Sequence, residues 1–392
     1  MKAIEMFAGI GGVHVGLARA GIGVVWANDI DPRACAVYRS HFGQESIICG
    51  DVKEAKLSIP QHELLTAGFP CQPFSAAGKK LGVHDEVRGT LFAEIVEVLE
   101  RVQPDFFILE NVKRLLSMEH GRHFRTILLA LTGAGYFVEW RLLNAKNFGL
   151  AQNRERVFIV GRKNTNDLLS RETSAFFKLS SVLLLEGELP IQDNLFSSSM
   201  VSDLLEPVGE KCKFGPAGFA YANEAYSLFP TGFPDQSPPQ LLRDVLEDAT
   251  DPCFDFTEAT NGWVQKNTEV NAFINGVEIL SNQDGGRRMG YTIFGTGGLA
   301  PTLTATTSRH YERYRVGDRY RRLTNVEYAK LQGFGRDWCG LACVYDQYSL
   351  YGNAVPPIMI EWIATRLLKR AVEPPDNDQP AEGHVAAVSS AS

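Results

Sequence analysis

A glycine-rich loop that joins an apolar segment to a helix-like segment constrains the fold of this chain more than any other feature. Residues 3–7 are a short apolar run, Ala-Gly-Ile-Gly-Gly follows at residues 8–12, and residues 13–20 have a helix-like composition. Glycines let the backbone turn sharply and approach a ligand closely, and a helix N-terminus directs free N–H groups towards negative charge. The pattern predicts a strand, a nucleotide-type loop and a helix within an open α/β sheet.

The next two apolar segments lead to acidic residues. Residues 23–27 precede Asn28-Asp29, about twenty residues beyond the loop, where a carboxylate can accept hydrogen bonds from ribose hydroxyls. A third apolar stretch ends at Gly50-Asp51. The loop spacing G-x-G-G differs from the dinucleotide fingerprint G-x-G-x-x-G. We therefore predict an adenosine cofactor without a pyrophosphate and disfavour a nicotinamide cofactor.

A cysteine follows a proline at the end of another predicted buried strand. Residues 64–67 are apolar, and Gly-Phe-Pro-Cys-Gln-Pro-Phe-Ser occupies residues 68–75. Ligands of an open α/β sheet bind at the carboxyl ends of its strands, so Cys71 is a candidate nucleophile. The alternative is a cysteine that packs as a small hydrophobic side chain, which is common for free cysteines.

Charged residues also accompany two later apolar segments. Glu110 follows the apolar residues 106–109, which would raise the pKa of its carboxyl and let it donate or share a proton. As a structural group, Glu110 would instead cap a following helix. Arg154 and Arg156 alternate before the apolar residues 157–160, so both point to one side of a strand and can hold a phosphate or a base carbonyl. A solvated edge strand is the alternative for the arginines.

Together these motifs resemble those of the cytosine-C5 DNA methyltransferases. The six motifs, in the order of that family, are F-A-G-x-G-G at 7–12, G-F-P-C-Q-P-F-S at 68–75, E-N-V at 110–112, Q-x-R-E-R at 152–156, R-x-L-T-x-x-E-x-x-x-L-Q-G-F at 321–334 and G-N-A-V at 352–355. They span the chain from near residue 1 to about residue 370. A single motif of this kind would be weak evidence, whereas the ordered set is specific.

The resemblance implies an α/β fold with a Rossmann-like, S-adenosylmethionine-dependent methyltransferase sheet and a second, smaller, irregular target-recognition domain. We predict that residues 1–162 form the catalytic and cofactor-binding domain around a mainly parallel sheet covered on both sides. Residues 163–320 lose the alternation of strands and helices, and Gly and Pro interrupt short apolar runs, as expected for a turn-rich target-recognition domain. Residues 321–372 would return to the catalytic domain, and the Pro/Ala/Ser-rich residues 373–392 would be a disordered tail.

The resemblance also implies the chemistry. A target cytosine would be flipped out of the duplex, Cys71 would add to its C6 atom, and C5 would take a methyl group from S-adenosylmethionine. Glu110 would hydrogen-bond or protonate N3 as charge develops on the ring. Arg156 would contact the base oxygen O2, and Arg154 would hold the target nucleotide or position Cys71. The base that removes the C5 proton is not evident from the sequence.

The same resemblance implies a set of cofactor-binding residues. They are Phe7 against the adenine, the backbone of Gly9, Gly11 and Gly12 along the methionine side, Asp29 and Ile30 near the ribose, Asp51 at the adenine amino group, Pro70 and Leu91 as apolar walls, and Asn353 at the methionine end. Where the family usually has Glu followed by a bulky residue, this chain has Asp29-Ile30. The shorter carboxylate and the non-aromatic neighbour put the affinity for the cofactor in doubt, not its identity.

Charge is distributed unevenly along the chain, although the net charge of −7 is modest. Residues 163–280 contain 18 acidic and 7 basic residues, whereas residues 281–322 contain eight arginines and three acidic residues, with tyrosines between them. Arginines and tyrosines in this pattern suit phosphates and base edges, and a solvated charged surface is the alternative. The predicted DNA-binding residues are Ser75, Arg287, Arg288, Thr302, Leu303, Arg309, Arg313 and Arg315, with Thr302 and Leu303 near the flipped base.

Composition excludes several other classes. Hydrophobic residues make up 44% of the chain, yet no eighteen-residue apolar run could span a membrane. Seven cysteines lack paired disulfide spacing, and Cys339-x-x-x-Cys343 has no second pair to complete a metal site, so we predict no metal. The N-terminus lacks the apolar core of a signal peptide. These features predict a soluble protein of the reducing cytoplasm.

Three functions remain open at this stage. The first is a DNA (cytosine-5)-methyltransferase that acts as a monomer on double-stranded DNA and protects one short sequence from a cognate restriction endonuclease, without a stable complex. The second is a tRNA cytosine-5 methyltransferase, which the long recognition segment and the absence of a C-F-T signature disfavour. The third is a silent base-flipping DNA-binding protein, which the presence of Cys71 and Glu110 disfavours.

Overall fold

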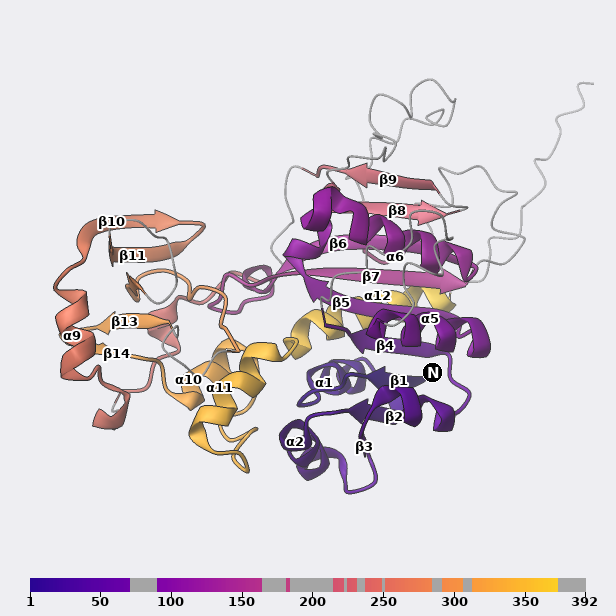
Figure 1. The fold of residues 1–392 in the computed structure, drawn as a ribbon, viewed down its shortest axis with the longest axis horizontal. Coiled ribbons are helices and arrows are strands. Elements are labelled where there is room, and N and C mark those ends of the chain that lie inside the picture. Colours follow the sequence, from indigo (N-terminus) through magenta and orange to yellow (C-terminus); the bar gives the residue numbers. More distant parts are fainter. Residues whose placement is uncertain are drawn as a thin grey trace, which may run out of the picture.

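Two β-sheets organise the chain, and they lie at opposite ends of the elongated view in Figure 1. The computed structural model describes residues 1–70, 90–163, 181–183, 214–221, 224–230, 237–248, 251–283, 291–305 and 312–372. The first sheet has nine strands and the second has five. The helical segments α10 and α11 lie between them in this view (Figure 1).

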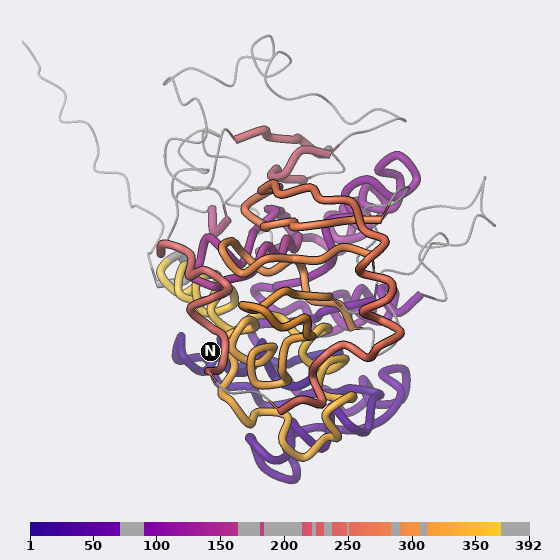
Figure 2. Tube along the Cα trace, turned by 90° about the vertical axis from the view of Figure 1, so that its left-hand side faces the viewer, coloured from indigo at the N-terminus to yellow at the C-terminus, as the bar shows by residue number. Residues whose placement is uncertain are grey.

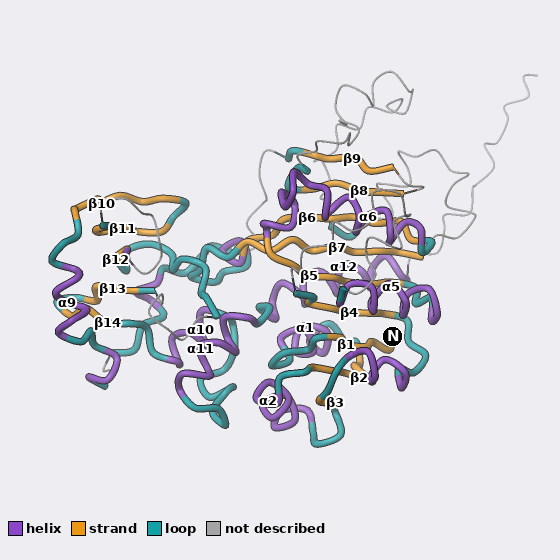
Figure 3. Tube along the Cα trace, viewed as in Figure 1, coloured by secondary structure: helices purple, strands orange, loops and turns teal. Residues whose placement is uncertain are grey.

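The first sheet is mixed, with strand order β3-β2-β1-β4-β5-β7-β6-β8-β9 (Figure 3). Its strands are β1 (Lys2–Met6), β2 (Gly23–Asp29), β3 (Ile48–Cys49), β4 (Leu64–Gly68), β5 (Phe106–Val112), β6 (Tyr136–Asn144), β7 (Glu155–Lys163), β8 (Ala217–Tyr221) and β9 (Glu224–Leu228). Neighbours from β3 to β5 are parallel, whereas every pairing from β5 to β9 is antiparallel. The expectation of a mainly parallel sheet is therefore correct only for the part of the sheet up to β5.

Helices cover both faces of the first sheet, which explains why its strands are apolar on both sides. Ala3 belongs to a core cluster with residues of α1 and α12, whereas its neighbour Ile4 belongs to a cluster with residues of α5 and α6. The helices of this part are α1 (Gly12–Arg19), α2 (Pro32–Phe42), α3 (Val52–Ala55), α5 (Leu91–Val102), α6 (Arg122–Gly133) and α12 (Pro357–Val372), and its 3-10 helices are η1 (Lys56–Ser58), η2 (Lys113–Gly121) and η3 (Ala145–Asn147).

The second sheet has strand order β10-β11-β12-β13-β14 and lies in front of the first part in Figure 2. Its elements are β10 (Thr268–Ile274), β11 (Val277–Asn282), β12 (Thr292–Phe294), β13 (Arg313–Val316), β14 (Arg319–Arg321), α9 (Glu258–Val264), η5 (Leu242–Asp244) and η6 (Pro252–Phe254). One hydrophobic cluster joins Phe294 and Tyr314 of this sheet to residues of α10 (Asn325–Leu331) and α11 (Val344–Asn353). The second sheet thus packs onto the segment that leads back to the first part.

Two expectations for residues 163–320 need correction. Strands β8 and β9 belong to the first sheet, because β8 pairs with the edge of β6 and buries Phe219 against Phe137. The region around residues 251–321 is not irregular, since it contains the five-stranded sheet. Short strands, register shifts and glycine-rich connections hid these strands from pattern analysis. The tail at 373–392 lies outside the described residues.

Candidate active site

The glycine-rich loop begins where β1 ends, and three of its residues have left-handed backbone angles. Phe7 has φ 58°, Gly9 has φ 56° and Gly11 has φ 86°. Helix α1 begins at Gly12, where a Cβ atom would lie 2.2 Å from the carbonyl oxygen of Val355. Glycine at position 12 therefore allows the C-terminal segment to approach the loop closely.

Asp29, at the end of β2, holds this loop in place. Its Oδ2 accepts the backbone N–H of Gly9 at 2.7 Å, and its Oδ1 accepts the N–H of Asp31 at 2.8 Å. Burial raises the pKa of the Asp29 carboxyl, and the hydrogen bonds from Asp31 and Gly9 oppose this rise. Asp31 caps α2 through the N–H of Arg33, while the side chain of Ile30 is 69% exposed. Asp29 thus stabilises the loop, and both of its carboxyl oxygens accept backbone hydrogen bonds.

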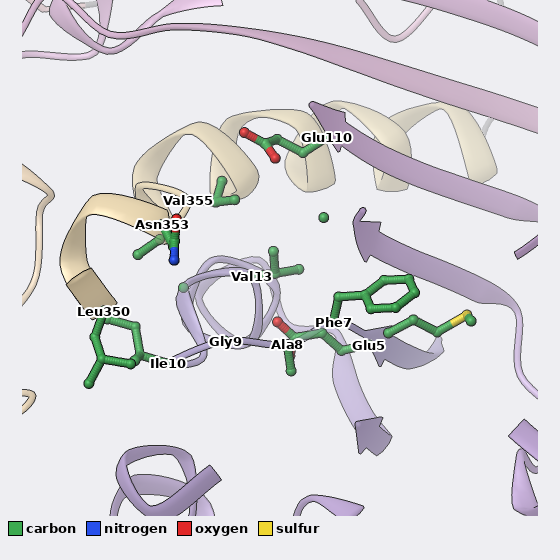
Figure 4. A pocket seen from close by; sticks show the side chains of 14 residues that line it. Glu5, Phe7, Ala8, Gly9, Ile10, Val13, Glu110, Leu350, Asn353 and Val355 are labelled. Atoms are coloured by element: carbon green, nitrogen blue, oxygen red, sulfur yellow. The ribbon is translucent and has the colours of Figure 1, made fainter. Parts of the chain in front are cut away.

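A pocket lies between the loop, the ends of β4 and β5, and the end of α11 (Figure 4). It contains about 500 Å³ of open space. Figure 4 shows Glu110 on one side of this space and Phe7, Ala8 and Gly9 on the other. The lining residues are Glu5, Met6, Phe7, Ala8, Gly9, Ile10, Gly12, Val13, Gly68, Glu110, Leu350, Asn353, Ala354 and Val355.

Glu5 is a buried carboxyl on the pocket lining that the sequence patterns did not reveal. The side chain is 1% exposed, its Oε2 accepts the hydroxyl of Tyr38 at 3.0 Å, and its Oε1 has no hydrogen-bond partner within the described part of the chain. Burial raises the pKa of Glu5 to about 8, and the Tyr38 hydrogen bond opposes this rise. An acidic residue inside the apolar run at residues 3–7 was the available signal.

Glu110 and Arg156 form an ion pair beside the pocket. Strands β5 and β7 run antiparallel, and Arg156 Nε lies 3.0 Å from Glu110 Oε1. Their side chains are only 13% and 12% exposed. Burial raises the pKa of the Glu110 carboxyl, and the charges of Arg156 and Arg154 oppose this rise. Because β5 continues to Val112, Glu110 lies within a strand and is not a helix cap.

Arg154 is almost completely buried and binds backbone carbonyls. Its Nη2 donates to the carbonyl oxygens of Gly352 at 2.9 Å and Ala354 at 2.8 Å, and its Nη1 donates to that of Leu303 at 3.3 Å. Burial lowers the pKa of this guanidinium. Arg154 therefore connects the start of β7 to two segments that lie 149 to 200 residues later in the chain.

The Thr302-Leu303 element is fixed against the Q-x-R-E-R motif. Thr302 Oγ1 donates to the carbonyl oxygen of Asn153 at 2.7 Å, and the N–H of Leu303 donates to Gln152 Oε1 at 3.1 Å. Leu303 is 1% exposed within the hydrophobic cluster that joins the second sheet to α10 and α11. Its side chain therefore packs in the core, and any influence of Leu303 on a DNA strand is indirect. Gln152 begins the Q-x-R-E-R motif, but the sequence analysis assigned no role to it.

The remaining predicted residues lie in several environments. Asp51 caps α3, where its side chain accepts the N–H of Lys53 at 2.9 Å. Pro70 is exposed, and Leu91 begins α5 and packs against the core. None of these three residues lines the pocket. Arg313 is 6% exposed, with its guanidinium carbon 6.0 Å from the ring centre of Trp263, whereas Arg315 is exposed beside Asp318. Cys71, Ser75, Arg287, Arg288 and Arg309 lie outside the described residues.

Two kinds of feature are absent from the described residues. No cluster of His, Cys, Asp and Glu there could hold a metal ion. No described helix is long and apolar enough to cross a membrane.

The motifs around this pocket agree with a family-wide pattern. A family model of the C-5 cytosine-specific DNA methylases matches residues 1–369. The chain belongs to this family. Membership, together with the two sheets, confirms the predicted fold class of an α/β methyltransferase with a second, smaller part.

Individual relatives of the chain differ in how much of its length they match. The type II methyltransferase M1.ScrFI of Lactococcus lactis subsp. cremoris is 30% identical over 94% of this chain and 78% of its own length. The type II methyltransferase M.NgoBI of Neisseria gonorrhoeae is 48% identical, but over 41% of this chain and 50% of its own length. The chain thus matches only half of the latter protein.

A solved structure shares the fold of this chain. The Dnmt2 methyltransferase of S. pombe superposes with a TM-score of 0.58 over 95% of this chain and 100% of its own. Sequence identity is 18%, so this likeness shows the common fold alone.

Proposed function

We propose that this chain is a DNA (cytosine-5)-methyltransferase that flips a cytosine out of a short specific sequence and methylates its C5 atom. The observation that supports this most directly is the largely buried Glu110–Arg156 ion pair beside the pocket, where Glu110 lies across from the glycine-rich loop. The family that matches the chain is one of DNA methylases, and its relatives are named type II methyltransferases. These names favour DNA over tRNA as the substrate.

The pocket residues fit S-adenosylmethionine as the methyl donor. Glu5 places on the lining a buried carboxyl oxygen that has no hydrogen-bond partner within the described residues, and a polar group of the bound cofactor would satisfy it. Phe7 offers an aromatic face for the adenine, and Asn353 offers an amide at the opposite end of the lining. When bound, this cofactor supplies a methyl group attached to a sulfonium sulfur.

We assign the remaining cofactor contacts to residues around this pocket. Gly9, Gly11 and Gly12 would supply backbone groups, and Asp29 would hold the loop in shape and lie near the ribose. The more distant candidates are Ile30, Asp51, Pro70 and Leu91, which would contact the cofactor from outside the lining described above.

Each of four residues of the chain has a separate role in the reaction at the cytosine. The Cys71 thiolate adds to C6, which makes C5 nucleophilic, and it leaves by elimination after the C5 proton is removed. Glu110, with its raised pKa, hydrogen-bonds or protonates N3 as charge develops there. Arg156 orients Glu110 through their ion pair and contacts O2 of the base. Arg154 positions the surrounding segments through its carbonyl contacts.

We assign target recognition to the part that contains the second sheet. Exposed Arg315, together with Arg287, Arg288 and Arg309, would contact phosphates or base edges of double-stranded DNA. Ser75 would contact the DNA near the flipped base. Arg313 and Leu303 are buried and would act by shaping this part rather than by touching DNA.

The biological setting is inferred from the type II relatives. We propose that the enzyme is monomeric, acts in the cytoplasm, and protects DNA from a restriction endonuclease that recognises the same sequence without forming a stable complex with it.

Bisulfite sequencing of DNA from a methylation-free host tests the function. Expression of the unchanged chain should protect cytosines in one short sequence context, and the Cys71→Ser variant should protect none. No protection by either chain would contradict the proposed reaction on DNA.

A further inference from the structure

The glycine-rich loop is held from two sides, and only one of them belongs to the first sheet. On the inner side, Asp29 accepts the N–H of Gly9, and the carbonyl of Asn28 accepts the N–H of Ala8 at 2.9 Å. On the outer side, Trp338 Nε1 donates to the carbonyl oxygen of Ile10 at 2.9 Å. Trp338 lies 328 residues after Ile10, in the segment between α10 and α11.

Trp338 is held in turn by the last turn of α2. The rings of His41 and Trp338 stack with centres 3.6 Å apart and an angle of 8° between their planes. His41 Nε2 also lies 2.7 Å from the carbonyl oxygen of Trp338, where the ring N–H donates. Phe42 packs against the indole edge at a ring-centre distance of 6.0 Å. His41 is exposed and Trp338 is half-buried, so His41 covers the outer face of the indole.

The same group of rings extends inwards to the pocket lining. His14 of α1 stacks on Phe42 at 3.7 Å and 8°, and its Nδ1 lies 2.6 Å from the Tyr38 hydroxyl that donates to Glu5. A Cβ atom on Gly11 would lie 2.4 Å from the Phe42 ring. The aromatic residues thus pack directly on the loop, between the pocket and the outer segment.

The loop needs such support because its conformation is not one that the chain favours locally. Phe7 is a non-glycine residue at φ 58°, and left-handed residues of this kind persist only where the surroundings enforce them. Ile10 is 1% exposed and lines the pocket, so a shift of its peptide group would change the shape of the lining.

We propose that His41 and Trp338 are positioning residues that hold the loop at residues 7–12 in the shape that binds the cofactor. This inference rests on the proposed function, because it assumes that the pocket binds S-adenosylmethionine. Neither side chain lines the pocket, so both act through the Ile10 carbonyl and through Phe42. We call His41 and Trp338 together the clasp. Because the segment around Trp338 is continuous with α10 and α11, the clasp also makes cofactor binding depend on the packing of that segment against the loop.

Calorimetric titration of the full chain with S-adenosylhomocysteine, the demethylated cofactor, tests this proposal. Trp338→Phe keeps an aromatic ring but removes the indole N–H, and it should weaken binding about fivefold, as expected for one lost hydrogen bond. His41→Ala should weaken binding about threefold through loss of the stacked ring, and His41→Phe should recover most of that loss. Because His41 is exposed, its replacement should leave the hydrophobic core undisturbed.

Trp362→Phe is the matched control. Trp362 is a half-buried tryptophan of α12 that packs on Phe148 and is absent from the pocket lining. It should bind the ligand as the unchanged chain does. In steady-state assays, the Trp338 and His41 variants should raise KM for S-adenosylmethionine and leave kcat and KM for DNA unchanged.

The outcomes separate this inference from the proposed function. If the unchanged chain does not bind S-adenosylhomocysteine, the proposed cofactor is wrong and the clasp has no such role. If the unchanged chain binds it and Trp338→Phe and His41→Ala bind equally well, the proposed function stands and the clasp is refuted. A loss of kcat without a change in KM for the cofactor would also refute it.

Discussion

The two sheets use arginine in different ways. In the first part, buried Arg154 binds backbone carbonyls, and the largely buried Arg156 pairs with the Glu110 carboxyl beside the pocket. In the second part, Arg321 forms a buried ion pair with Glu327, whereas Arg319 pairs with Asp255 at the surface. An excess of arginine therefore does not by itself locate a DNA contact, because some of these side chains stabilise the fold.

The largest expected effect is at Cys71, the proposed nucleophile. Cys71→Ala should abolish methyl transfer, because no other group would add to C6. DNA containing 5-fluorocytosine at the target should form a covalent adduct with the unchanged chain, and peptide mass spectrometry should assign it to Cys71. Cys253→Ser, which changes an exposed cysteine of the second part, is the control and should remain active. Turnover on fluorinated DNA without an adduct would contradict the thiolate mechanism.

Glu110 gives the next largest effect. Glu110→Gln should lower kcat by about 10²- to 10⁴-fold, because an amide cannot protonate N3. Since burial raises the pKa of this carboxyl, its protonated form is lost only as the pH rises through that raised value. The activity of the unchanged chain should fall over that range, and the residual activity of the variant should lack this fall. A pH–rate profile that is the same for both chains would argue against the assigned role.

The buried pair of the second part should matter for stability and not for chemistry. Arg321 and Glu327 are 2% and 0% exposed and pair at 2.8 Å. Glu327→Ala should lower the free energy of unfolding by about 3–5 kcal/mol, because it leaves a buried guanidinium without its partner. Asp318→Asn, which alters the exposed pair with Arg315, should leave the unfolding midpoint unchanged. If denaturant titrations show equal losses in the free energy of unfolding for the two substitutions, the buried arginine pair does not stabilise the fold more than the surface pair.

Glu5 should make the stability of the first part depend on pH. Its folded pKa of about 8 lies above the ordinary value of 4.5, so the folded chain holds a proton that the unfolded chain releases within this range. The contribution is fully present below pH 4.5 and is lost as the pH rises towards 8, at roughly 1.4 kcal/mol per pH unit. Glu5→Gln should flatten this slope in unfolding titrations without cofactor. An unchanged slope would show that Glu5 is ionised in the fold.

The smallest expected effect tests a surface arginine of the second part. Arg315→Ala should weaken DNA binding by less than about tenfold. It should also reduce the slope of the logarithm of the binding constant against the logarithm of the salt concentration by about one, as expected for one phosphate contact. Arg319→Ala, which removes the partner of Asp255, is the comparison and should change the salt dependence less. Binding isotherms at several salt concentrations measure both. If Arg319 has the larger effect, the assignment of the two arginines is reversed.

Local patterns in the chain were sufficient to predict the cofactor edge of the first sheet. Apolar runs that end in Gly, Asp or Glu specify both the strands and the polar residues at their carboxyl ends, so the sequence alone predicted that Phe7, Gly9 and Glu110 lie near one another. The ordered motifs identified the family for the same reason, since each lies within a few consecutive residues.

Contacts between residues that are distant in the chain could be identified only from the tertiary structure. The carbonyls bound by Arg154, the indole that contacts Ile10, and the edge of β6 that receives β8 all lie many residues away from their partners. Burial, too, separates Arg313 from Arg315 although both belong to one strand. Hydrophobic and charge patterns repeat over a few residues, so they specify which face of an element is apolar. Which segment covers that face is determined only when the whole chain packs.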